Sequence, residues 1–225
     1  MPLLSVIIPV YNEARTIGHL VERVNAVNID KEIIVVDDGS TDGTGKLLRG
    51  MYFDRFKVIH HTRNRGKGSA LITGLSHATG EYVIIQDADL EYHPEEYTKL
   101  METMKTGNAD LVMGARFTKG YHGMLIPRLG NRFLTSFLNF LFGSDLNDFF
   151  TCYKLCRREN LLSLNLSSTS FNIETEIVAK ALKRRWRIME VPIEYVPRSY
   201  TEGKKIRVMD GIAAMLSIIK YRIKG

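Results

Sequence analysis

Residues 31–44 read KEIIVVDDGSTDGT. The run of Val and Ile within Glu32–Val36 predicts a strand buried on both faces, because such strands are almost continuously apolar. Acidic residues, Gly, Ser and Thr follow it directly, and apolar residues then return at helical spacing over Gly43–Met51. A buried strand that passes through a polar turn into a helix is the repeating unit of α/β proteins.

The same unit recurs through the first half of the chain. Strands are predicted at Leu3–Val10, Glu32–Val36, Val58–His60, Tyr82–Gln86 and Asp110–Gly114, and helices at Ala14–Val27, Gly43–Met51, Gly68–His77 and Glu95–Thr106. This alternation predicts an α/β fold with a Rossmann-like, mostly parallel central sheet and helices on both faces. Ligands of such folds bind outside the carboxyl ends of the strands, so we expect the site in the loops that follow them.

The second half, from about Phe117, departs from this alternation. Its predicted elements are a strand at Phe149–Leu155, a helix at Phe171–Arg185, an edge strand at Arg187–Val196 and an amphipathic helix at Val208–Ile223. The sequence shows no internal repeat and no obvious linker. We therefore expect residues 1–225 to form a single domain around one core.

The composition, with 44% hydrophobic and 25% charged residues among 225, is that of an ordinary globular protein. Two cysteines, Cys152 and Cys156, are too few for a disulfide framework and lack zinc-site spacing, which favours a reducing compartment. The longest apolar stretches fall short of the ~20 residues of a membrane span, and Leu3–Val10 lacks the features of a signal peptide. We expect a cytoplasmic protein.

The net charge of +6 suits nucleic acid, an anionic membrane surface or phosphorylated small molecules. The basic residues are dispersed and form no recognisable nucleic-acid-binding module, so nucleic acid is not an expected partner. The six histidines lack the spacing of metal ligands and are interpreted as ordinary core or surface residues.

Acidic residues follow three of the predicted strands, in the segments PVYNE (9–13), DDGSTDG (37–43) and DAD (87–89). Carboxylates at the end of a buried strand are tolerated mainly when a cation or hydrogen-bond donors neutralise them. A D-x-D pair suits Mg²⁺ or Mn²⁺, which commonly bridge protein carboxylates to substrate phosphates. This predicts a nucleoside diphosphate at Asp87 and Asp89, while Asp37 and Asp38 have the alternative interpretation of caps for the next helix.

A glycine-containing segment, RNRGKGSA (63–70), lies between the second and third acidic loops. Glycines permit close backbone approach, and the following helix would offer its N-terminus to an anion. The segment is therefore predicted to face a phosphate. Its spacing does not match a P-loop or a dinucleotide-binding fingerprint.

Four ordered motifs, PVYNE, VVDDGSTDGT, RNxGKGxA and DADL, resemble the family 2 inverting glycosyltransferases of the GT-A fold. The resemblance implies a nucleotide-sugar-binding half over about residues 1–116 and an acceptor half over about 117–225. It implies that the first two loops hold the nucleoside and that D-x-D holds the metal and diphosphate. The implied donor-binding residues are Pro9, Tyr11, Glu13, Asp37, Asp38, Lys67, Asp87 and Asp89, and the implied metal ligands are Asp87, Asp89 and Glu91.

The second half resembles the polyprenyl-phosphate branch of that family, which includes dolichyl-phosphate mannose and glucose synthases. The matching segments are GAR (114–116), NDFFTCYK (147–154), FNIETE (171–176), EVPI (190–193) and RSYTEGKK (198–205). The resemblance implies a UDP- or GDP-linked hexose donor and a polyprenyl or dolichyl phosphate acceptor. Glu91 stands where mannose synthases often have Gln, and Phe150 where many relatives carry an acid. The EGKK ending is more similar to relatives that use UDP-sugars.

A lipid monophosphate is already anionic at neutral pH, so its attack on the sugar needs no protein base. Asp89 then acts through the metal, and Arg116, Arg198 and Lys205 are the expected clamps for the phosphate-bearing substrates. If the acceptor were a sugar hydroxyl, as in polysaccharide or glycolipid synthesis, Asp148 would be the natural general base. Glu174 and Glu176 are two residues apart, so at most one is expected to face the site.

The basic amphipathic C-terminal helix has two interpretations. It packs its apolar face on the domain, or it contacts a membrane surface, where a polyprenyl substrate must be met. Residues Tyr121–Phe142 are interpreted as a mobile acceptor loop with a similar role. These features predict a peripheral protein on the cytoplasmic face of a membrane, with a membrane-anchoring subunit as a further candidate partner.

Overall fold

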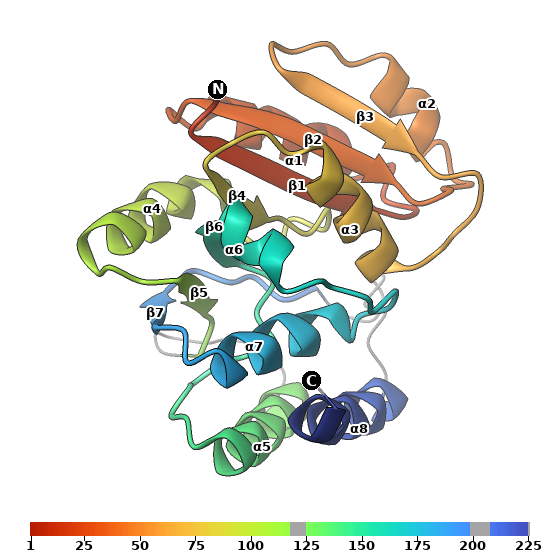
Figure 1. Ribbon diagram of the computed structural model, residues 1–225. Helices are drawn as coiled ribbons and strands as arrows, with labels where there is room; N and C mark the ends of the chain where they lie inside the picture. The colour runs from red at the N-terminus through yellow and green to blue at the C-terminus, as the bar shows by residue number, and fades with distance from the viewer. Residues whose placement is uncertain (118–124, 199–207, 225) are drawn as a thin grey trace.

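A seven-stranded sheet with the order β3-β2-β1-β4-β6-β5-β7 forms the centre of the molecule (Figure 1). The computed structural model describes residues 1–117, 125–198 and 208–224. The strands are β1 Leu4–Val10, β2 Lys31–Asp37, β3 Phe56–His60, β4 Tyr82–Ile85, β5 Leu111–Ala115, β6 Lys154–Arg157 and β7 Ile188–Pro192. Only β6 runs antiparallel to its neighbours, β4 and β5. The predicted mostly parallel sheet is thus confirmed, with β7 at an edge as expected.

Helices cover both faces of this sheet (Figure 1). They are α1 Ile17–Ala26, α2 Thr44–Arg49, α3 Lys67–His77, α4 Tyr97–Thr106 after the 3₁₀ turn η1 Pro94–Glu96, α5 Leu125–Phe142, α6 Arg158–Ser163, α7 Ile173–Lys183 and α8 Val208–Lys224. The long helices α5 and α8 pack together and against α7, below the sheet in Figure 1. None of the described helices is both long and apolar enough to cross a membrane.

The core lies around β1, all seven residues of which are buried. Helix α3 crosses β1 closely at Gly74, where an added Cβ would lie 2.4 Å from Cγ2 of Ile7. The loops that follow β1 and β2 therefore start from a rigid, tightly packed layer. This rigidity fixes where the loops that carry the acidic residues begin.

A buried carboxylate, Glu32, connects the amino ends of neighbouring strands, at the end of the sheet away from the acidic loops. Its Oε1 accepts hydrogen bonds from Ser5 Oγ at 2.7 Å and from the Thr79 amide at 2.6 Å, and Lys57 lies 3.3 Å from its Oε2. Burial alone would raise the pKa of Glu32, but the hydrogen bonds from Ser5 and Thr79 and the charge of Lys57 together lower it. Glu32 therefore stabilises the fold in its charged form.

The predicted strand at Phe149–Leu155 is wrong over most of its length, because β6 begins only at Lys154. The polar groups of the preceding segment bind side chains instead of a neighbouring strand. The Cys152 amide donates to the Tyr92 hydroxyl at 2.9 Å, and the ammonium of Lys154 donates to the Phe149 and Thr151 carbonyls. Satisfied in this way, the segment does not join the sheet.

The predicted acceptor loop at Tyr121–Phe142 is also wrong where the structure describes it, because Leu125–Phe142 forms the 18-residue helix α5. Residues 118–124 lie outside the described part of the chain. Pro127 does not break the helix because it lies in the first turn, where the backbone N–H has no partner within the helix anyway. Leu134 and Leu138, four residues apart, are buried and give α5 its inner face.

Candidate active site

The loops that follow β1, β2 and β4 meet at one end of the sheet. Strand β1 pairs with β2 on one side and with β4 on the other, so their carboxyl ends are adjacent. The Asn12 amide donates to Ser40 Oγ at 2.9 Å, and Thr16 Oγ1 donates to the Ala88 carbonyl at 2.7 Å. The structure thus brings together the three acidic loops that the sequence singled out, at the point where the strand order reverses. Pro9 lies within β1, and Tyr11 follows it with 36% of its surface exposed.

A single arginine, Arg198, joins carboxylates from two of these loops. Its guanidinium donates to both carboxylate oxygens of Glu13, at 3.0 and 3.1 Å, and Nη2 lies 3.4 Å from Oδ2 of Asp89. The Arg198 amide donates to Oε1 of Glu91 at 2.8 Å. Arg198 was expected at a phosphate, and the structure places it against the acids that follow β1 and β4.

Asp89 lies in a site that is rich in negative charge. The pKa of Asp89 is raised to about 7: burial contributes most, the charges of Asp87 and Glu91 add to the rise, and Arg198 opposes it. Asp89 and Asp87 are hard oxygen donors, and a divalent cation would relieve the repulsion between them. Among the described residues no group of three or more His, Cys, Asp or Glu side chains is arranged to hold a metal ion. Mg²⁺ and Mn²⁺ commonly take one or two protein carboxylates and complete their coordination with phosphate oxygens and water, so the donor chemistry of Asp87 and Asp89 suits either ion.

A row of alternating charges runs inward from Asp87. Lys67 Nζ lies 2.6 Å from Asp87 Oδ1 and 2.8 Å from Glu174 Oε1, and Lys154 Nζ lies 2.6 Å from Glu174 Oε2. Burial would raise the pKa of Glu174, but the charges of Lys154 and Lys67 lower it. Glu176 points elsewhere, where it accepts the amides of the Ser167–Ser168 segment and pairs with Lys180 at 2.7 Å. Only Glu174 is therefore connected to the site, in line with the expectation of one at most.

Several amides of the predicted phosphate-facing segment, residues 63–70, have partners within the protein. The amides of Arg65 and Gly66 donate to Asp38, and the Ser69 amide donates to the Thr169 carbonyl at 3.2 Å. A Cβ on Gly66 would lie 2.3 Å from the Thr169 oxygen, and Gly66 has a φ of +93°. The glycines thus allow the close approach of the 168–170 segment, and the amides of Arg65, Gly66 and Ser69 are used within the fold.

Asp37 and Asp38 are both buried and have internal partners. Asp38 Oδ1 lies 2.6 Å from His61 Nδ1, and Asp37 Oδ2 lies 3.0 Å from His60 Nδ1. The Ser40 amide donates to Asp37 at 3.0 Å, as expected of a turn cap. The sequence interpretation missed these histidines. The parallel register of β2 and β3, which sets Asp37 opposite His60, is the signal that would have found them.

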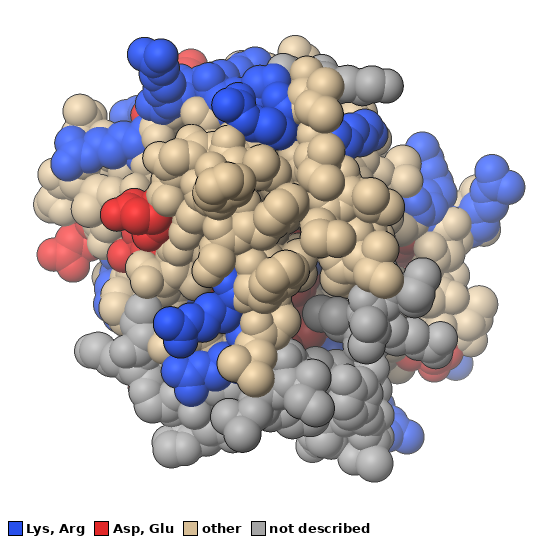
Figure 2. Space-filling model, turned by 90° about the horizontal axis from the view of Figure 1, so that it is seen from below, with Lys and Arg blue, Asp and Glu red and all other residues tan. Residues whose placement is uncertain are grey.

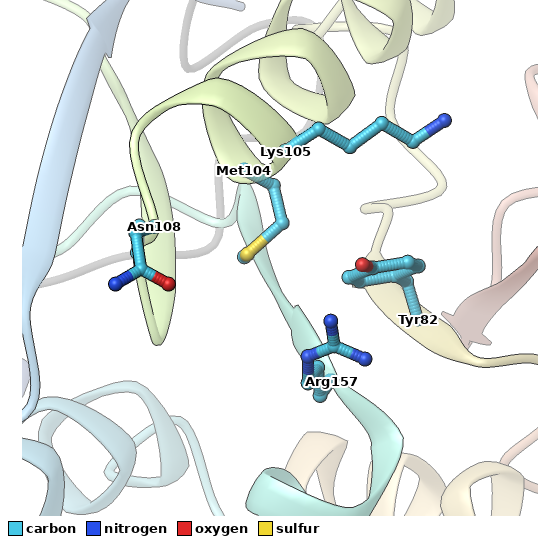
Figure 3. A pocket seen from close by; sticks show the side chains of 6 residues that line it. Tyr82, Met104, Lys105, Asn108 and Arg157 are labelled. Carbon is cyan, nitrogen blue, oxygen red and sulfur yellow. The ribbon is translucent and has the colours of Figure 1, made fainter.

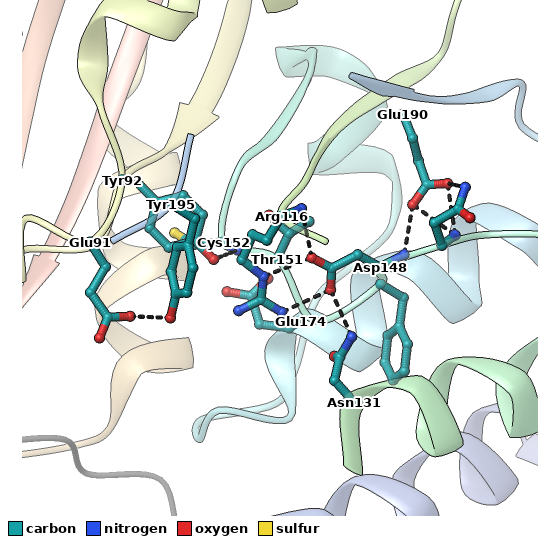
Figure 4. Close-up of polar contacts among 12 residues, drawn as sticks. Glu91, Tyr92, Arg116, Asn131, Asp148, Thr151, Cys152, Glu174, Glu190 and Tyr195 are labelled. Atoms are coloured by element: carbon teal, nitrogen blue, oxygen red, sulfur yellow. Dashed lines mark hydrogen bonds and ion pairs between the residues drawn. The ribbon is translucent and has the colours of Figure 1, made fainter. Parts of the chain in front are cut away.

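A second cluster, predicted from the sequence to bind the acceptor, is organised around Arg116 and Asp148 (Figure 4). Asp148, which is fully buried, accepts from Arg116 Nε at 2.7 Å, Arg116 Nη2 at 2.8 Å and the Arg116 amide at 3.1 Å. Asn131 of α5 donates to Asp148 at 3.1 Å, and Glu190 of β7 accepts the Asp148 amide at 2.8 Å. Burial would lower the pKa of Arg116, but the charge of Asp148 raises it well above its usual value. Sequence analysis found neither Asn131 nor Glu190.

Tyr195 connects the cluster around Arg116 and Asp148 to the acids that follow β4. Its hydroxyl donates to Glu91 Oε2 at 2.5 Å, and the Arg116 guanidinium lies 5.2 Å from the centre of its ring (Figure 4). Such a position over an aromatic face is favourable for a cation. The acids after β4 and the buried Arg116–Asp148 pair are thereby parts of one contiguous site. Lys205, the third expected phosphate clamp, lies outside the described residues.

A cavity of about 290 Å³ lies away from this site (Figure 3). It is lined by Tyr82, Met104, Lys105, Asn108, Ala109 and Arg157. Tyr82 begins β4, whereas Asp87 follows the end of that strand, so the cavity opens at the amino end of β4. The Arg157 guanidinium lies over the Tyr82 ring at 5.1 Å and pairs with Glu81 at 2.6 Å. None of the predicted site residues lines it.

Comparison with known proteins identifies the family. Residues 5–163 match the family described as Glycosyl transferase family 2. The chain belongs to glycosyltransferase family 2. The polyprenol monophosphomannose synthase of Mycolicibacterium smegmatis is 31% identical over 240 residues, which cover 98% of this chain and 87% of that protein. The dolichol-phosphate mannosyltransferase of Pyrococcus furiosus is 32% identical over 215 residues, with 89% of this glycosyltransferase matched.

The glycosyltransferase spans 58% of the Pyrococcus furiosus protein, and 48% and 63% of two Haloferax volcanii relatives. In fold it is similar to glucosyl-3-phosphoglycerate synthase from Mycobacterium tuberculosis in complex with UDP, with a TM-score of 0.76 at 22% identity. That match covers 98% of this chain and 80% of the other. The same enzyme has been solved with Mn²⁺ and UDP, and with Mg²⁺ and UDP. The expected GT-A fold and glycosyltransferase class are therefore confirmed.

Proposed function

We propose that this glycosyltransferase transfers a hexose, with inversion, from a UDP- or GDP-linked donor to a polyprenyl or dolichyl phosphate, with the help of Mg²⁺ or Mn²⁺. The observation that carries the proposal is the continuity of the site. Tyr195 joins Glu91, beside the D-x-D acids, to Arg116. A carboxylate pair for a metal diphosphate and a buried cation for an acceptor anion thus lie side by side. Relatives named for polyprenol and dolichol phosphates support this choice of acceptor.

On the donor side, the nucleoside binds over the loops after β1 and β2. The residues proposed for it are Pro9, Tyr11, Glu13, Asp37 and Asp38. Asp37 and Asp38 contribute by fixing the conformation of the loops, because both are buried and already accept internal hydrogen bonds. Lys67 positions Asp87, which it contacts at 2.6 Å.

Asp87 and Asp89, with Glu91 nearby, are the residues proposed to hold the metal. When bound, such an ion stabilises the negative charge that develops on the departing nucleoside diphosphate. The acceptor phosphate oxygen attacks the anomeric carbon from the face opposite the diphosphate. The bond from that carbon to the diphosphate oxygen breaks, and the configuration of the sugar is inverted. Arg116, Arg198 and Lys205 bind and orient the phosphate groups, since guanidinium donors match phosphate oxygens in geometry.

Asp148 is better suited to holding Arg116 than to removing a proton. It is fully buried, and all its described partners, Arg116 and Asn131, are donors to its carboxylate. A base for a sugar hydroxyl would need an oxygen within hydrogen-bond reach of the substrate. This favours an acceptor that arrives as an anion over the alternative of a hydroxyl acceptor.

The lower face of the molecule is the proposed contact with the membrane. Side chains of α5 and α8 that expose large apolar surfaces include Leu129, Phe133, Phe140, Leu216 and Ile223. Figure 2 looks onto the molecule from below: residues other than Lys, Arg, Asp and Glu fill much of the centre, and groups of Lys and Arg lie around them. The opposite face of α8 packs on the domain through Ile218 and Tyr221, which leaves its exposed apolar side chains for the proposed membrane contact. An apolar surface flanked by cations suits the cytoplasmic face of an anionic membrane.

One transfer experiment tests the acceptor. The purified chain is incubated with Mn²⁺, labelled UDP- and GDP-hexoses and a short polyprenyl phosphate, with the matching unphosphorylated polyprenol as control. We expect label to enter the organic phase with the phosphate only, and in the inverted configuration. Transfer to the polyprenol, or only to a soluble sugar, would contradict the proposal. Flotation with liposomes tests the membrane contact; failure to float with anionic vesicles would assign docking to an anchoring subunit.

A further inference from the structure

We propose that Arg198 is an internal counter-cation, which occupies the acids of the donor site until nucleoside diphosphate and metal arrive together. The inference rests on the proposed function, because it concerns the same acids. It predicts that the metal alone binds weakly, and that the nucleotide releases Arg198 and strengthens metal binding.

The contacts of Arg198 carry the argument. Two nitrogens of its guanidinium pair with both oxygens of Glu13, and one of them also lies 3.4 Å from Asp89. The side chain of Arg198 is only 18% exposed, so solvent screens these charges weakly. One arginine thus supplies positive charge to carboxylates that follow β1 and β4.

Arg198 and a metal ion compete for the same atoms. A divalent cation at Asp89 would lie beside a guanidinium that is already 3.4 Å from Oδ2 of that residue. Two cations so close repel each other strongly in a partly buried site. Metal binding therefore requires Arg198 to leave, and the cost of its departure weakens the affinity for the metal.

Arg198 is only partly satisfied where it lies. Its Nε is buried without a hydrogen-bond partner among the described residues, and the nearest carboxylate oxygen to it, Oε1 of Glu91, is 4.0 Å away. The oxygens of a diphosphate would match the planar guanidinium group of Arg198 in geometry better than the carboxylates of Glu13, Asp89 and Glu91 do. The nucleotide thereby removes the competitor and adds metal ligands at the same time. Because such coupling is reciprocal, metal must also strengthen nucleotide binding by the same factor.

The test measures Mn²⁺ binding by electron paramagnetic resonance of the free ion, with and without UDP or GDP. The full chain is compared with Arg198→Met, which removes the charge but keeps most of the side-chain length. Arg198→Lys keeps the positive charge but lacks the planar guanidinium group. Arg184→Met is the matched control, because Arg184 is exposed and its described contacts are with Ser163. Thermal melting confirms that each variant is folded.

We expect Arg198→Met to bind Mn²⁺ alone about tenfold more tightly than the unmodified chain, since one nearby charge shifts a binding equilibrium at a carboxylate by about this factor. Arg184→Met should show no change and Arg198→Lys a smaller gain. With nucleotide present, the advantage of Arg198→Met should disappear. Equal or weaker Mn²⁺ binding by Arg198→Met would overturn the inference, while nucleotide-dependent Mn²⁺ binding would still support the proposed function. The reverse result, tighter Mn²⁺ binding by the variant without any nucleotide binding, would support the counter-cation and remove the proposed function.

Discussion

Replacing Asp148 with Asn would leave Arg116 charged and buried without its partner. Asp148 is fully buried and meets two guanidinium nitrogens of Arg116 at 2.7 and 2.8 Å. Breaking a buried ion pair on one side costs about 3–5 kcal/mol, because the remaining charge keeps its desolvation penalty. Asp148→Asn should therefore lower the free energy of unfolding by that amount.

Urea denaturation followed by circular dichroism measures this change. Asp145→Asn is the matched control, because Asp145 is exposed and three residues away; it should change stability by less than about 0.5 kcal/mol. The double variant Arg116→Met/Asp148→Asn should recover much of the loss, since no unpaired charge remains. If Asp148→Asn were as stable as Asp145→Asn, or the double variant were less stable than Asp148→Asn, the assigned pairing would be refuted.

Three further predictions follow from other parts of the molecule. Glu32 has a lowered pKa in the folded chain, so its contribution is present above its unfolded pKa of about 4.3 and is lost as the pH falls; Glu32→Gln should lower the melting temperature at pH 7 and much less at pH 3. Gly68→Ala should destabilise the fold, because its Cβ would lie 2.1 Å from the Ser168 oxygen, whereas Gly130→Ala in α5, with open space around it, should stabilise by about 0.5–1 kcal/mol in urea denaturation. Phe133→Ser with Phe140→Ser should reduce flotation with anionic liposomes without lowering the melting temperature, since both rings are exposed; unchanged flotation would place the membrane contact elsewhere.

The sequence was a good guide where one residue type dominates a whole element. The runs of Val and Ile in β1, β2 and β4 predicted those strands to within a residue or two, because a strand buried on both faces has little choice of side chain. The acidic loops were placed correctly for the same reason, since they follow directly from the ends of parallel strands. Helix α5 was missed because its segment was interpreted as a mobile loop, although Pro127 lies in the first turn, where a proline is compatible with a helix.

Contacts that join distant parts of the chain could not be predicted in this way. Glu190 accepts the amide of Asp148 from 42 residues away, and Arg198 meets Glu13 from 185 residues away. Each pairing depends on how β7 and the segment after it pass the other strands. Gly66 and Gly68 were predicted to face a phosphate, and the residues that approach them closely, at 168–169, come from the second half of the chain, which no local pattern indicates. Local patterns identified which residues are unusual, and the tertiary fold determined their partners.

The central claim is that the acids after β4 hold a metal ion against the diphosphate of an activated sugar. Isothermal titration calorimetry of UDP- and GDP-hexoses into the full chain, with Mn²⁺ and with EDTA, tests it most directly. We predict that one nucleotide-sugar binds with Mn²⁺, that EDTA weakens its binding at least about tenfold, and that Asp89→Asn does the same in the presence of Mn²⁺. Equal affinity in all three conditions, or no binding of either donor class, would contradict it.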